Sequence, residues 1–415
     1  MVNTFYDCYV ILNKVYGEKA FIKQAITDTP IEEKNRAVTT KICYGVLDKD
    51  ITLSYYIKYL APKSPKLAVR TILKIATYSI KFLGKKPYAV TDAAVELTKK
   101  LGKGGASGFV NAFLRKFISA DIPLPNDKLQ KLSVEYSYPE FVIKDLIKTF
   151  GKERTERIAA SEVHNTTVAF YEKNGEEYLK DRKFDYEKTP FVNVYNVKNF
   201  VRNADYDAGV YTYQSIGSVA ICEAVSGGKN LLDCCAAPGG KTVRLSHKFD
   251  FVTAWDIYPH RVELIKDYVK RMKRENVIAE VCDAKVFNPL YEKSFDAVLC
   301  DAPCSGTGVM SDNPDIKLNR EESDVLKLIE EQKSILNTVC RYVKENGFLY
   351  YSTCSIMSVE NYGVIKEFLA DHTEYELVAT DSPLPHEKID KTLQFLPDIS
   401  GGCGFYFAKL KRKHV

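Results

Sequence analysis

Two cysteines in the C-terminal half of the chain follow stretches that are typical of buried β-strands. Cys304 lies in the sequence Asp-Ala-Pro-Cys-Ser-Gly-Thr-Gly after one apolar run, and Cys354 lies in Tyr-Ser-Thr-Cys-Ser after another. Side chains at the carboxyl ends of parallel strands project into a ligand crevice. The pattern therefore allows one thiol to act as a nucleophile and the other to assist it. The alternative is that both are small buried apolar residues, as free cysteines commonly are.

A glycine-rich turn upstream predicts a ligand-binding loop. Residues 231–242 have the pattern of an apolar strand, a tight loop with Gly239 and Gly240, and the start of a helix. Adjacent glycines let a backbone approach a ligand closely, which a Cβ atom would prevent. Because the glycine spacing fits neither a P-loop nor a dinucleotide fingerprint, a nucleotide-like ligand without phosphates is favoured. A turn that only connects a strand to a helix is the alternative.

Three acidic residues end successive strand-like stretches of the same region. Asp256 closes the apolar run 251–256, and Asp283 follows the strand-like residues 278–282, with a helical pattern between them. A carboxylate one strand after the glycine loop is placed to bind a ribose diol. Asp283 could accept a hydrogen bond from an adenine amino group, or it could be a surface residue in a turn. Together with Asp301, these acids predict one shared ligand crevice.

The motifs together resemble those of a bacterial RNA (cytosine-5) methyltransferase of the RsmB (Sun/Fmu) family. The residues that carry this resemblance are 235–242, 301–309, 313–317, 353–355 and 404–410. The resemblance implies an α/β, Rossmann-like fold that uses S-adenosyl-L-methionine to methylate carbon 5 of a cytosine in small-subunit (16S) ribosomal RNA. The same chemistry on transfer RNA or on another ribosomal position, a DNA methyltransferase, and a non-enzymatic RNA-binding factor are the alternatives.

The chemistry of such an enzyme explains why two cysteines are required. Carbon 5 of cytosine becomes nucleophilic only after a thiolate has added to carbon 6, and the carbon 5 proton must leave before elimination. In the family the cysteine of Thr-Cys-Ser attacks and the cysteine after proline aids release, so the resemblance assigns Cys354 as nucleophile and Cys304 as release partner. We expect Lys241 or the cofactor sulfonium to lower the pKa of the attacking thiol. Asp301 is expected to hold the amino or ring-nitrogen edge of a cytosine that has left its stack.

The expected site combines these roles. The expected catalytic residues are Cys354, Cys304, Asp301 and Lys241. The expected cofactor-binding residues are Cys235, Ala236, Ala237, Pro238, Gly239, Gly240, Lys241, Asp256, Asp283 and Asp301. No metal is expected, because the sequence has no CxxC pair and its six histidines are scattered.

Cysteine usage and the N-terminus indicate the compartment. The eleven cysteines have no paired spacing, which is typical of reduced thiols inside a cell. Residues 1–16 lack the layout of a signal peptide, since Asp7 interrupts their apolar residues. No apolar stretch approaches the roughly 20 residues of a membrane span. We therefore expect a soluble cytoplasmic protein without a membrane partner.

The distribution of charge indicates an RNA-binding region near the N-terminus. The chain as a whole has a formal net charge of only +5, but between residues 63 and 116 basic residues far outnumber acidic ones. A helical apolar pattern in this region places Arg70, Lys74 and Lys81 on one flank, as expected for phosphate contacts. A merely solvated lysine face is the alternative.

At 415 residues the chain is too long for one ordinary core, and we expect three domains. The helical residues 1–122 resemble a NusB-like RNA-binding domain. After a proline-containing linker, residues 128–207 are expected to form a small α/β RNA-binding extension, and residues 208–415 the Rossmann-like catalytic domain. The expected partner is ribosomal RNA with a single-stranded or locally opened cytosine. No heptad pattern suggests self-association, so we expect a monomer.

Two residues depart from the family pattern. Leu318 stands where the family commonly has tryptophan, and Cys403 stands where it usually has aspartate. We expect the first to weaken packing or base stacking near the site and the second to remove a charge from its rim.

Overall fold

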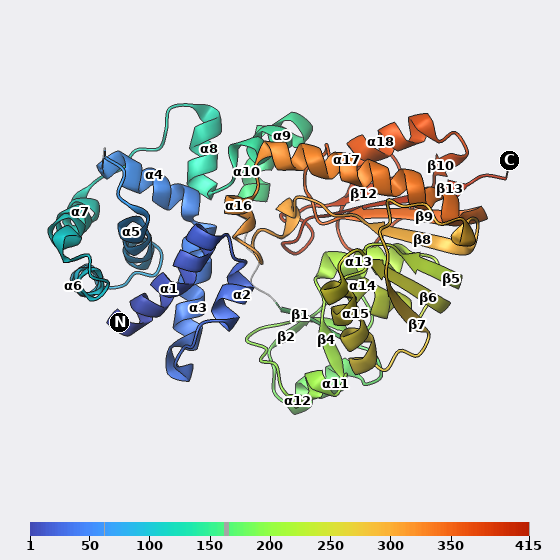
Figure 1. The fold of residues 1–415 in the computed structure, drawn as a ribbon, viewed down its shortest axis with the longest axis horizontal. Coiled ribbons are helices and arrows are strands. Elements are labelled where there is room, and N and C mark those ends of the chain that lie inside the picture. Colours follow the sequence, from blue (N-terminus) through green and yellow to red (C-terminus); the bar gives the residue numbers. More distant parts are fainter. Residues whose placement is uncertain (62, 162–165, 415) are drawn as a thin grey trace. The chain divides into compact units, whose positions relative to one another are not determined.

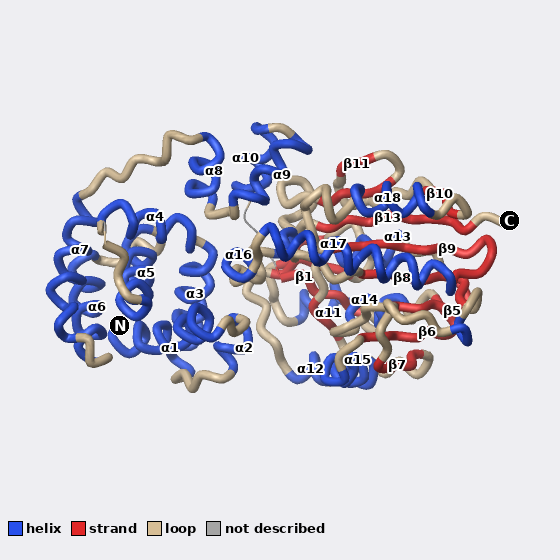
Figure 2. Tube along the Cα trace, turned by 45° about the horizontal axis from the view of Figure 1, so that its top comes forward, coloured by secondary structure: helices blue, strands red, loops and turns tan. Residues whose placement is uncertain are grey.

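The chain, described by a computed structural model at residues 1–61, 63–161 and 166–414, divides into two compact units (Figure 1). The first unit comprises Met1–Ala159 and Met310–Glu321, and the second comprises Ala160–Val309 and Glu322–Val415. The first is built of helices, whereas the strands, red in Figure 2, belong to the second. This division is coarser than the three expected domains, whose boundaries stay predictions. Residues 128–159, expected to open the α/β extension, lie with the helical unit.

The helical unit forms because its apolar residues recur at helical spacing. In α5, for example, Val69, Ile72, Leu73 and Ala76 are all buried, as their spacing predicts. The all-helical fold expected for the N-terminal region is confirmed. The helices are α1 Val2–Glu18, α2 Ile22–Thr27, α3 Glu33–Asp48, α4 Asp50–Leu60, α5 Leu67–Lys81, α6 Pro87–Lys100, the 3-10 turn η1 Gly104–Ala106, α7 Ser107–Ser119, α8 Lys128–Tyr136, α9 Glu140–Phe150, α10 Lys152–Ala160 and α16 Ile316–Asn319.

Lys74 does not belong to the basic flank expected for α5. The residue is only 4% exposed, and its Nζ lies 2.5 Å from Asp50 Oδ1. The hydroxyl of Tyr16 also donates to that carboxylate. A buried ammonium requires such a partner, because its desolvation is otherwise costly. The prediction that Lys74 contacts phosphate is therefore wrong, whereas Lys81 is exposed as expected.

The segment Met310–Glu321, although it follows the Pro-Cys motif, packs within the helical unit. The ammonium of Lys317 donates to the Asp48 carboxylate at 2.6 Å and to the Asp48 carbonyl at 3.0 Å. The Lys317 side chain is 2% exposed, and its Nζ lies 5.0 Å from the centre of the Tyr138 ring. Leu318 helps to line a cavity of about 490 Å³ in this unit. Leu318 also packs against the helical core, so the change from tryptophan affects packing within this unit, and its effect on base stacking stays a prediction.

Replacing Asp48 by asparagine should destabilise the helical unit. The buried Lys317 ammonium would lose its carboxylate, and removing one partner of a buried ion pair typically costs about 3 kcal/mol or more. Thermal unfolding of Asp48→Asn should therefore show a clearly lower midpoint than the wild type. The control Glu156→Gln breaks an exposed pair with Lys152 and should leave the midpoint nearly unchanged. Equal midpoints for Asp48→Asn and wild type would contradict this account of Lys317.

The larger sheet of the second unit has the strand order β11-β12-β13-β9-β8-β5-β6-β7, with β10 paired to β13. Strands β9, β8, β5, β6 and β7 are parallel, and β10 to β13 form an antiparallel margin beside β9. This is the Rossmann-like α/β fold that the motifs predicted. The strands are β5 Gly228–Asp233, β6 Phe249–Asp256, β7 Val277–Val281, β8 Phe295–Asp301, β9 Val343–Thr353, β10 Tyr375–Leu377, β11 Glu387–Ile389, β12 Thr392–Phe395 and β13 Phe405–Arg412.

Helices cover both faces of this sheet. Strand β8 shows why, because Ala297 and Leu299 pack on one side while Val298 and Cys300 pack on the other. The first side is covered by α13 and α14, with α15 against β6, and the second by α17 and α18 (Figure 1). The helices and turns of this unit are α13 Ile216–Ala224, α14 Gly240–Leu245, α15 Pro259–Arg271, η2 Pro289–Tyr291, η3 Thr307–Val309, α17 Glu322–Val339, η4 Cys340–Tyr342 and α18 Tyr362–Asp371.

A small antiparallel sheet of order β2-β3-β1-β4 precedes the large one in sequence. Its core is aromatic, with the rings of Phe170, Tyr178 and Tyr211 in mutual contact. It corresponds to the small α/β element that was expected. Its elements are β1 Thr166–Phe170, α11 Gly175–Asp181, β2 Tyr186–Lys188, β3 Val194–Val197, α12 Ala204–Asp207 and β4 Tyr211–Tyr213. Among the helices described in either unit, none has the length and apolar character needed to cross a bilayer.

Candidate active site

A cavity of about 380 Å³ lies at the carboxyl ends of the parallel strands. Strand β5 pairs with β6 on one side and with β8 on the other, so the strand order reverses here, where ligands of open α/β sheets bind. The cavity brings together both cysteines and all three strand-terminal acids that the sequence singled out. Of the expected site residues, those that line it are Cys235, Ala237, Asp256, Asp283, Asp301, Cys304 and Cys354.

The rest of the glycine loop shapes the cavity without lining it. Gly239 has a φ of 104°, a left-handed conformation that favours glycine, and its N–H donates to the carbonyl of Ala236 at 2.8 Å. Gly240 then begins α14. Five of the expected cofactor-binding residues do not line the cavity, namely Ala236, Pro238, Gly239, Gly240 and Lys241.

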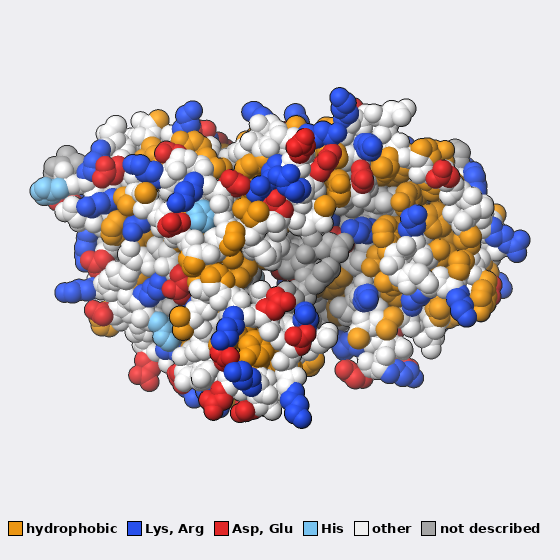
Figure 3. Space-filling view, turned by 180° about the vertical axis from the view of Figure 1, so that it is seen from behind, with side chains coloured by type: hydrophobic (Ala, Val, Ile, Leu, Met, Phe, Trp, Pro, Cys, Tyr) orange, Lys and Arg blue, Asp and Glu red, His pale blue; other side chains and the backbone are white. Residues whose placement is uncertain are grey.

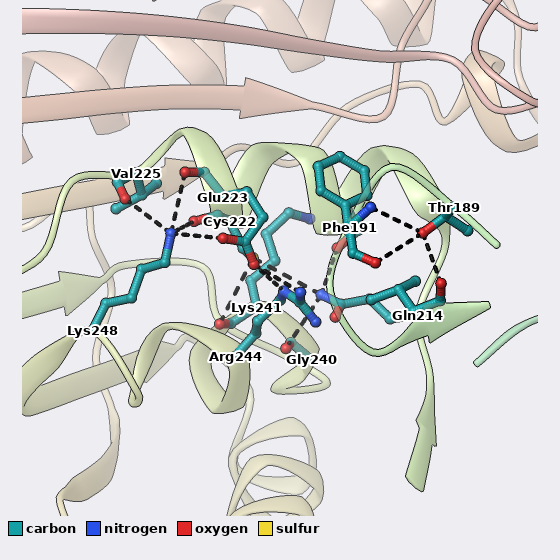
Figure 4. A network of polar contacts seen from close by, with 12 residues as sticks. Thr189, Phe191, Gln214, Cys222, Glu223, Val225, Gly240, Lys241, Arg244 and Lys248 are labelled. Carbon is teal, nitrogen blue, oxygen red and sulfur yellow. Dashed lines mark hydrogen bonds and ion pairs between the residues drawn. The ribbon is translucent and has the colours of Figure 1, made fainter. Parts of the chain in front are cut away.

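A polar network holds α14 and the glycine loop against α13 (Figure 4). Arg244 donates twice to the Glu223 carboxylate, at 2.7 and 3.0 Å, and Lys248 donates to main-chain carbonyls at the end of α13. Gln214 Nε2 donates to the carbonyl of Gly240 at 3.4 Å. The loop is thus fixed from behind, which leaves its backbone free to approach a ligand on the cavity side.

Asp256 is held in a defined orientation at the end of β6. The residue is 3% exposed, its Oδ1 accepts a hydrogen bond from the N–H of Tyr258, and its Oδ2 lies 3.2 Å from Arg261. Arg261 and Tyr258 also line the cavity, as do Glu331 and Ile335 of α17. These four residues lie at helix and loop positions outside any motif, where the sequence carries no ligand signal.

Lys241 is connected to the cavity by an ion pair with Asp301, which lines it. Its Nζ lies 2.7 Å from Asp301 Oδ2, and the hydroxyl of Ser352 donates to Oδ1 at 2.7 Å. Burial opposes the charged form of Lys241, but the Asp301 carboxylate outweighs it and raises the pKa of the lysine above its usual range, with a thiolate at Cys354 adding to this effect. The expected influence of Lys241 on the attacking thiol stays a prediction.

The two cysteines are in direct contact. Their Sγ atoms lie 3.2 Å apart, and the backbone N–H of Cys354 donates to the sulfur of Cys304 at 3.3 Å. The hydrogen bond to Cys354, together with burial, raises the pKa of the Cys304 thiol well above its usual value. The raised pKa favours the thiol form of Cys304, and either sulfur can be the donor in the contact between them.

Two glycines close the contact between the cysteine loops and the last strand. The N–H of Gly308 donates to the carbonyl of Cys354 at 2.9 Å, and the N–H of Gly404 donates to the carbonyl of Gly308 at 2.7 Å. A Cβ on Gly308 would lie 2.0 Å from the Gly404 oxygen, so only glycine fits. Cys403, beside Gly404, is 4% exposed and packs in the core below the sheet. The expectation that it stands on the site rim is wrong.

Asp233, the last residue of β5, is fully buried beneath the cavity. Its Oδ2 accepts a hydrogen bond from the hydroxyl of Thr242 at 2.7 Å, but its Oδ1 has no partner among the described residues. Burial raises the pKa of Asp233 to about 7, with the Asp301 charge adding and the Thr242 hydrogen bond opposing. Asp233 was not predicted as a site residue, because an acid that follows an apolar strand is as often exposed as buried.

Asp233 should make stability fall as pH rises towards neutrality. Its pKa is higher in the folded than in the unfolded chain, so the folded state binds the proton more tightly, and stability declines between the ordinary carboxyl pKa and about 7. Asp233→Asn cannot ionise, so its unfolding midpoint should drop less than that of wild type between about pH 5 and about pH 8. The control Asp250→Asn removes an exposed carboxylate of β6 and should keep the wild-type pH dependence. A wild-type slope in Asp233→Asn would contradict the assignment.

Family models match both units of the chain. Residues 221–411 match the model described as 16S rRNA methyltransferase RsmB/F, and residues 1–119 match the NusB family. The probable ribosomal RNA small subunit methyltransferase B of Bacillus subtilis (strain 168) is 29% identical, over 97% of this chain and 96% of that protein. The ribosomal RNA small subunit methyltransferase B of Pasteurella multocida (strain Pm70) is 28% identical, over 97% of this chain and 94% of that protein.

Solved structures share the fold. The crystal structure of PH0851 matches with a TM-score of 0.83 at 23% identity, covering 99% of this chain and 99% of that chain. The structure of NSun6 from Pyrococcus horikoshii with SFG matches with a TM-score of 0.60 at 17% identity, covering 68% of this chain and 100% of that chain. At these identities the likeness concerns the fold alone.

Proposed function

Since this chain belongs to the RsmB/F methyltransferase family and carries an N-terminal NusB domain, we propose that it transfers a methyl group from S-adenosyl-L-methionine to carbon 5 of a cytosine in small-subunit (16S) ribosomal RNA. The observation that carries the proposal is the contact of the two cysteine sulfurs, 3.2 Å apart, at a cavity lined by three strand-terminal carboxylates. The family's substrate favours ribosomal RNA over transfer RNA, which stays the alternative.

The chemistry of the cavity fits S-adenosyl-L-methionine. Its volume of about 380 Å³ is in the range of small-molecule sites, roughly 300–1,000 Å³. Carboxylates suit a ligand with a ribose diol, an amino group and a cationic centre, and we assign these contacts to Asp256, Asp283 and Asp301 respectively. The bound cofactor would supply the methyl group. Cys235 and Ala237 complete the wall of the cavity on the side of the glycine loop.

We assign the covalent step to Cys354. Its thiolate adds to carbon 6 of the cytosine, which makes carbon 5 nucleophilic. Asp301, oriented by Lys241 and Ser352, is the group that would face the ring-nitrogen edge of the base and favour the adduct by a hydrogen bond there.

Cys304 completes the cycle in this assignment. As the bond between Cys354 and carbon 6 breaks, the Cys304 thiol gives its proton to the departing sulfur. In the same elimination Cys304 takes the proton from carbon 5, and the electrons of that C–H bond form the C5–C6 double bond and expel the Cys354 sulfur, so both cysteines end as thiols and the methylated base is released. The raised pKa of the Cys304 thiol and the 3.2 Å separation of the sulfurs support this role.

The turn between α5 and α6 is the candidate contact for RNA in the helical unit. Lys81 and Lys86 are exposed, Tyr88 is 67% exposed, and no acid occurs within residues 81–88. Lysines neutralise phosphates and aromatic faces stack on bases, a combination typical of single-strand contacts. At the right in Figure 3, basic side chains of this unit likewise stand among apolar ones.

Separate replacement of the cysteines tests the mechanism. With labelled S-adenosyl-L-methionine and protein-free small-subunit ribosomal RNA, Cys354→Ala should lose methyl transfer, because no thiolate remains to attack. Cys304→Ala should instead accumulate a covalent protein–RNA adduct, visible on a denaturing gel, because release is blocked. Cys403→Ala, which changes a buried cysteine outside the cavity lining, is the matched control and should stay active. Loss of activity in Cys304→Ala with the adduct trapped in Cys354→Ala would reverse the roles.

Transfer RNA serves as the second substrate in the same assay. Methylation of transfer RNA and not of small-subunit ribosomal RNA by the wild type would overturn the substrate while leaving the chemistry in place.

Reversing the charge of Lys86 should weaken RNA binding. Lys86→Glu should raise the Kd for ribosomal RNA and lower the slope of log Kd against log salt by about 0.7 for each phosphate that the protein no longer neutralises. Binding of S-adenosyl-L-methionine should be unchanged. The control Lys366→Glu makes the same charge change on an exposed residue of α18 and should leave the slope near that of wild type. Equal slopes for the two variants would exclude the turn as a specific contact.

A further inference from the structure

A buried carboxylate joins the two loops that carry the cysteines. Glu360 is fully buried, and its Oε1 accepts a hydrogen bond from the backbone N–H of Ser305 at 2.8 Å. Its Oε2 accepts hydrogen bonds from the hydroxyls of Ser305 and Ser355, the latter at 2.7 Å. Ser305 follows Cys304 directly, and Ser355 follows Cys354. One side chain therefore holds the residue after each thiol.

Neutral donors alone satisfy this carboxylate. Gln332 Nε2 donates to Glu360 at 3.2 Å and to the carbonyl of Pro303 at 2.9 Å, so it adds a further link to the Pro-Cys loop. Within the described residues, no lysine, arginine or histidine forms an ion pair with Glu360. A desolvated charge without a counter-ion is costly unless its donors are well placed. The bonds to both serines are consequently charge-assisted, short and directional.

The next residue braces the same loop from the other side. Asn361 Nδ2 donates to the carbonyl of Ser355 at 2.9 Å, and the hydroxyl of Thr353 donates to Asn361 Oδ1 at 2.6 Å. Glu360 and Asn361 directly precede α18, a helix packed on the sheet. The cysteine loops are thus fixed from a rigid element, which is how functional groups keep a defined geometry.

We propose that Glu360 is a positioning residue that sets the separation of the Cys304 and Cys354 thiols. The inference rests on the function proposed above, in which one sulfur attacks and the other gives and takes a proton. Those two tasks need different protonation states on sulfurs only 3.2 Å apart. A carboxylate bound to both loops fixes the separation that this division of tasks requires.

The electrostatics of the pair agree with this role. The largest cause of the raised pKa of Cys304 is its hydrogen bond to Cys354, followed by burial, and the charge of Glu360 adds to both. Tyr351, whose hydroxyl donates to the carbonyl of Glu360, is a further titratable group near the thiol. Removing the charge of Glu360 should therefore make Cys304 easier to deprotonate.

Glu360→Gln tests the proposal because it keeps the shape of the side chain but loses the charge and one acceptor. We expect kcat for methyl transfer to fall by about 10- to 100-fold, because small misplacements of reacting groups lower the rate by such factors. The KM values for RNA and for S-adenosyl-L-methionine should stay near wild type, since neither substrate touches Glu360 in the proposed mechanism. The thiol of Cys304 should also react severalfold faster with iodoacetamide, measured by mass spectrometry of the peptide that contains it.

The matched control is Tyr351→Phe, which removes the contacts of the tyrosine hydroxyl with the backbone carbonyl of Glu360 at 2.7 Å and with Gln332 Oε1 at 3.1 Å and keeps the hydrogen bonds that the Glu360 carboxylate receives. It should lower the unfolding midpoint but keep kcat and the alkylation rate of Cys304. Should Glu360→Gln fail to fold, Ser355→Ala cuts the carboxylate from the Cys354 loop alone. In the Cys304→Ala background, Ser355→Ala should slow formation of the covalent RNA adduct while cofactor binding is kept.

Each outcome has a defined meaning. Wild-type kcat and wild-type alkylation in Glu360→Gln would overturn the proposal, and so would equal losses of kcat in Glu360→Gln and Tyr351→Phe. A wild-type enzyme that transfers no methyl group to RNA would instead defeat the proposed function. The alkylation of Cys304 still decides the effect of Glu360 in that case, because it needs no RNA.

Discussion

The hydrogen-bonded register between β8 and β9 is the constraint on which the site depends. Asp301 lies opposite Ser352 in this parallel pair, and the N–H of Ala302 donates to the carbonyl of Ser352 at 2.9 Å. The loops that leave these two strand ends therefore start side by side, and each soon reaches its cysteine. A slip of one residue would turn Asp301 to the other face of the sheet and separate it from Lys241. The core residues Val298 and Cys300 oppose such a slip, because they fill the layer under α17 and α18.

Three carboxyl groups near this pair of strands differ in the partners that they have. Asp301 has a lysine and a hydroxyl, so it forms an ion pair inside the site. Asp233 has one hydroxyl and an oxygen without a partner among the described residues, and its burial raises its pKa. Glu360 has several neutral donors and no cation in the described structure, and these donors come from the two loops that carry the cysteines and from Gln332. The three carboxyl groups are alike in the sequence, and their surroundings alone give them different chemistry.

Sequence patterns predicted the strand ends well because apolar runs and glycine turns are local signals. The positions of Cys304, Cys354, Asp256 and Asp301 follow directly from such runs, and the structure places all four at one cavity. Lys74 was misjudged because a helical pattern cannot reveal that Asp50 lies opposite it on a neighbouring helix. Neither Glu360 nor the placement of Met310–Glu321 has any local signature, since both depend on contacts between residues far apart in the chain.

Each of the two units is built from two separate segments of the chain. The polypeptide enters the second unit at Ala160, leaves it after Val309 and returns at Glu322, so no single cut separates the two units. A gene fragment that encoded only the sheet-containing part would still encode Lys317, whose counter-ion Asp48 would be missing. If the helical part were exchanged between related genes, Met310–Glu321 would have to pack against the helices of a different protein. To separate the two units, the chain would have to be cut before Ala160, after Val309 and before Glu322.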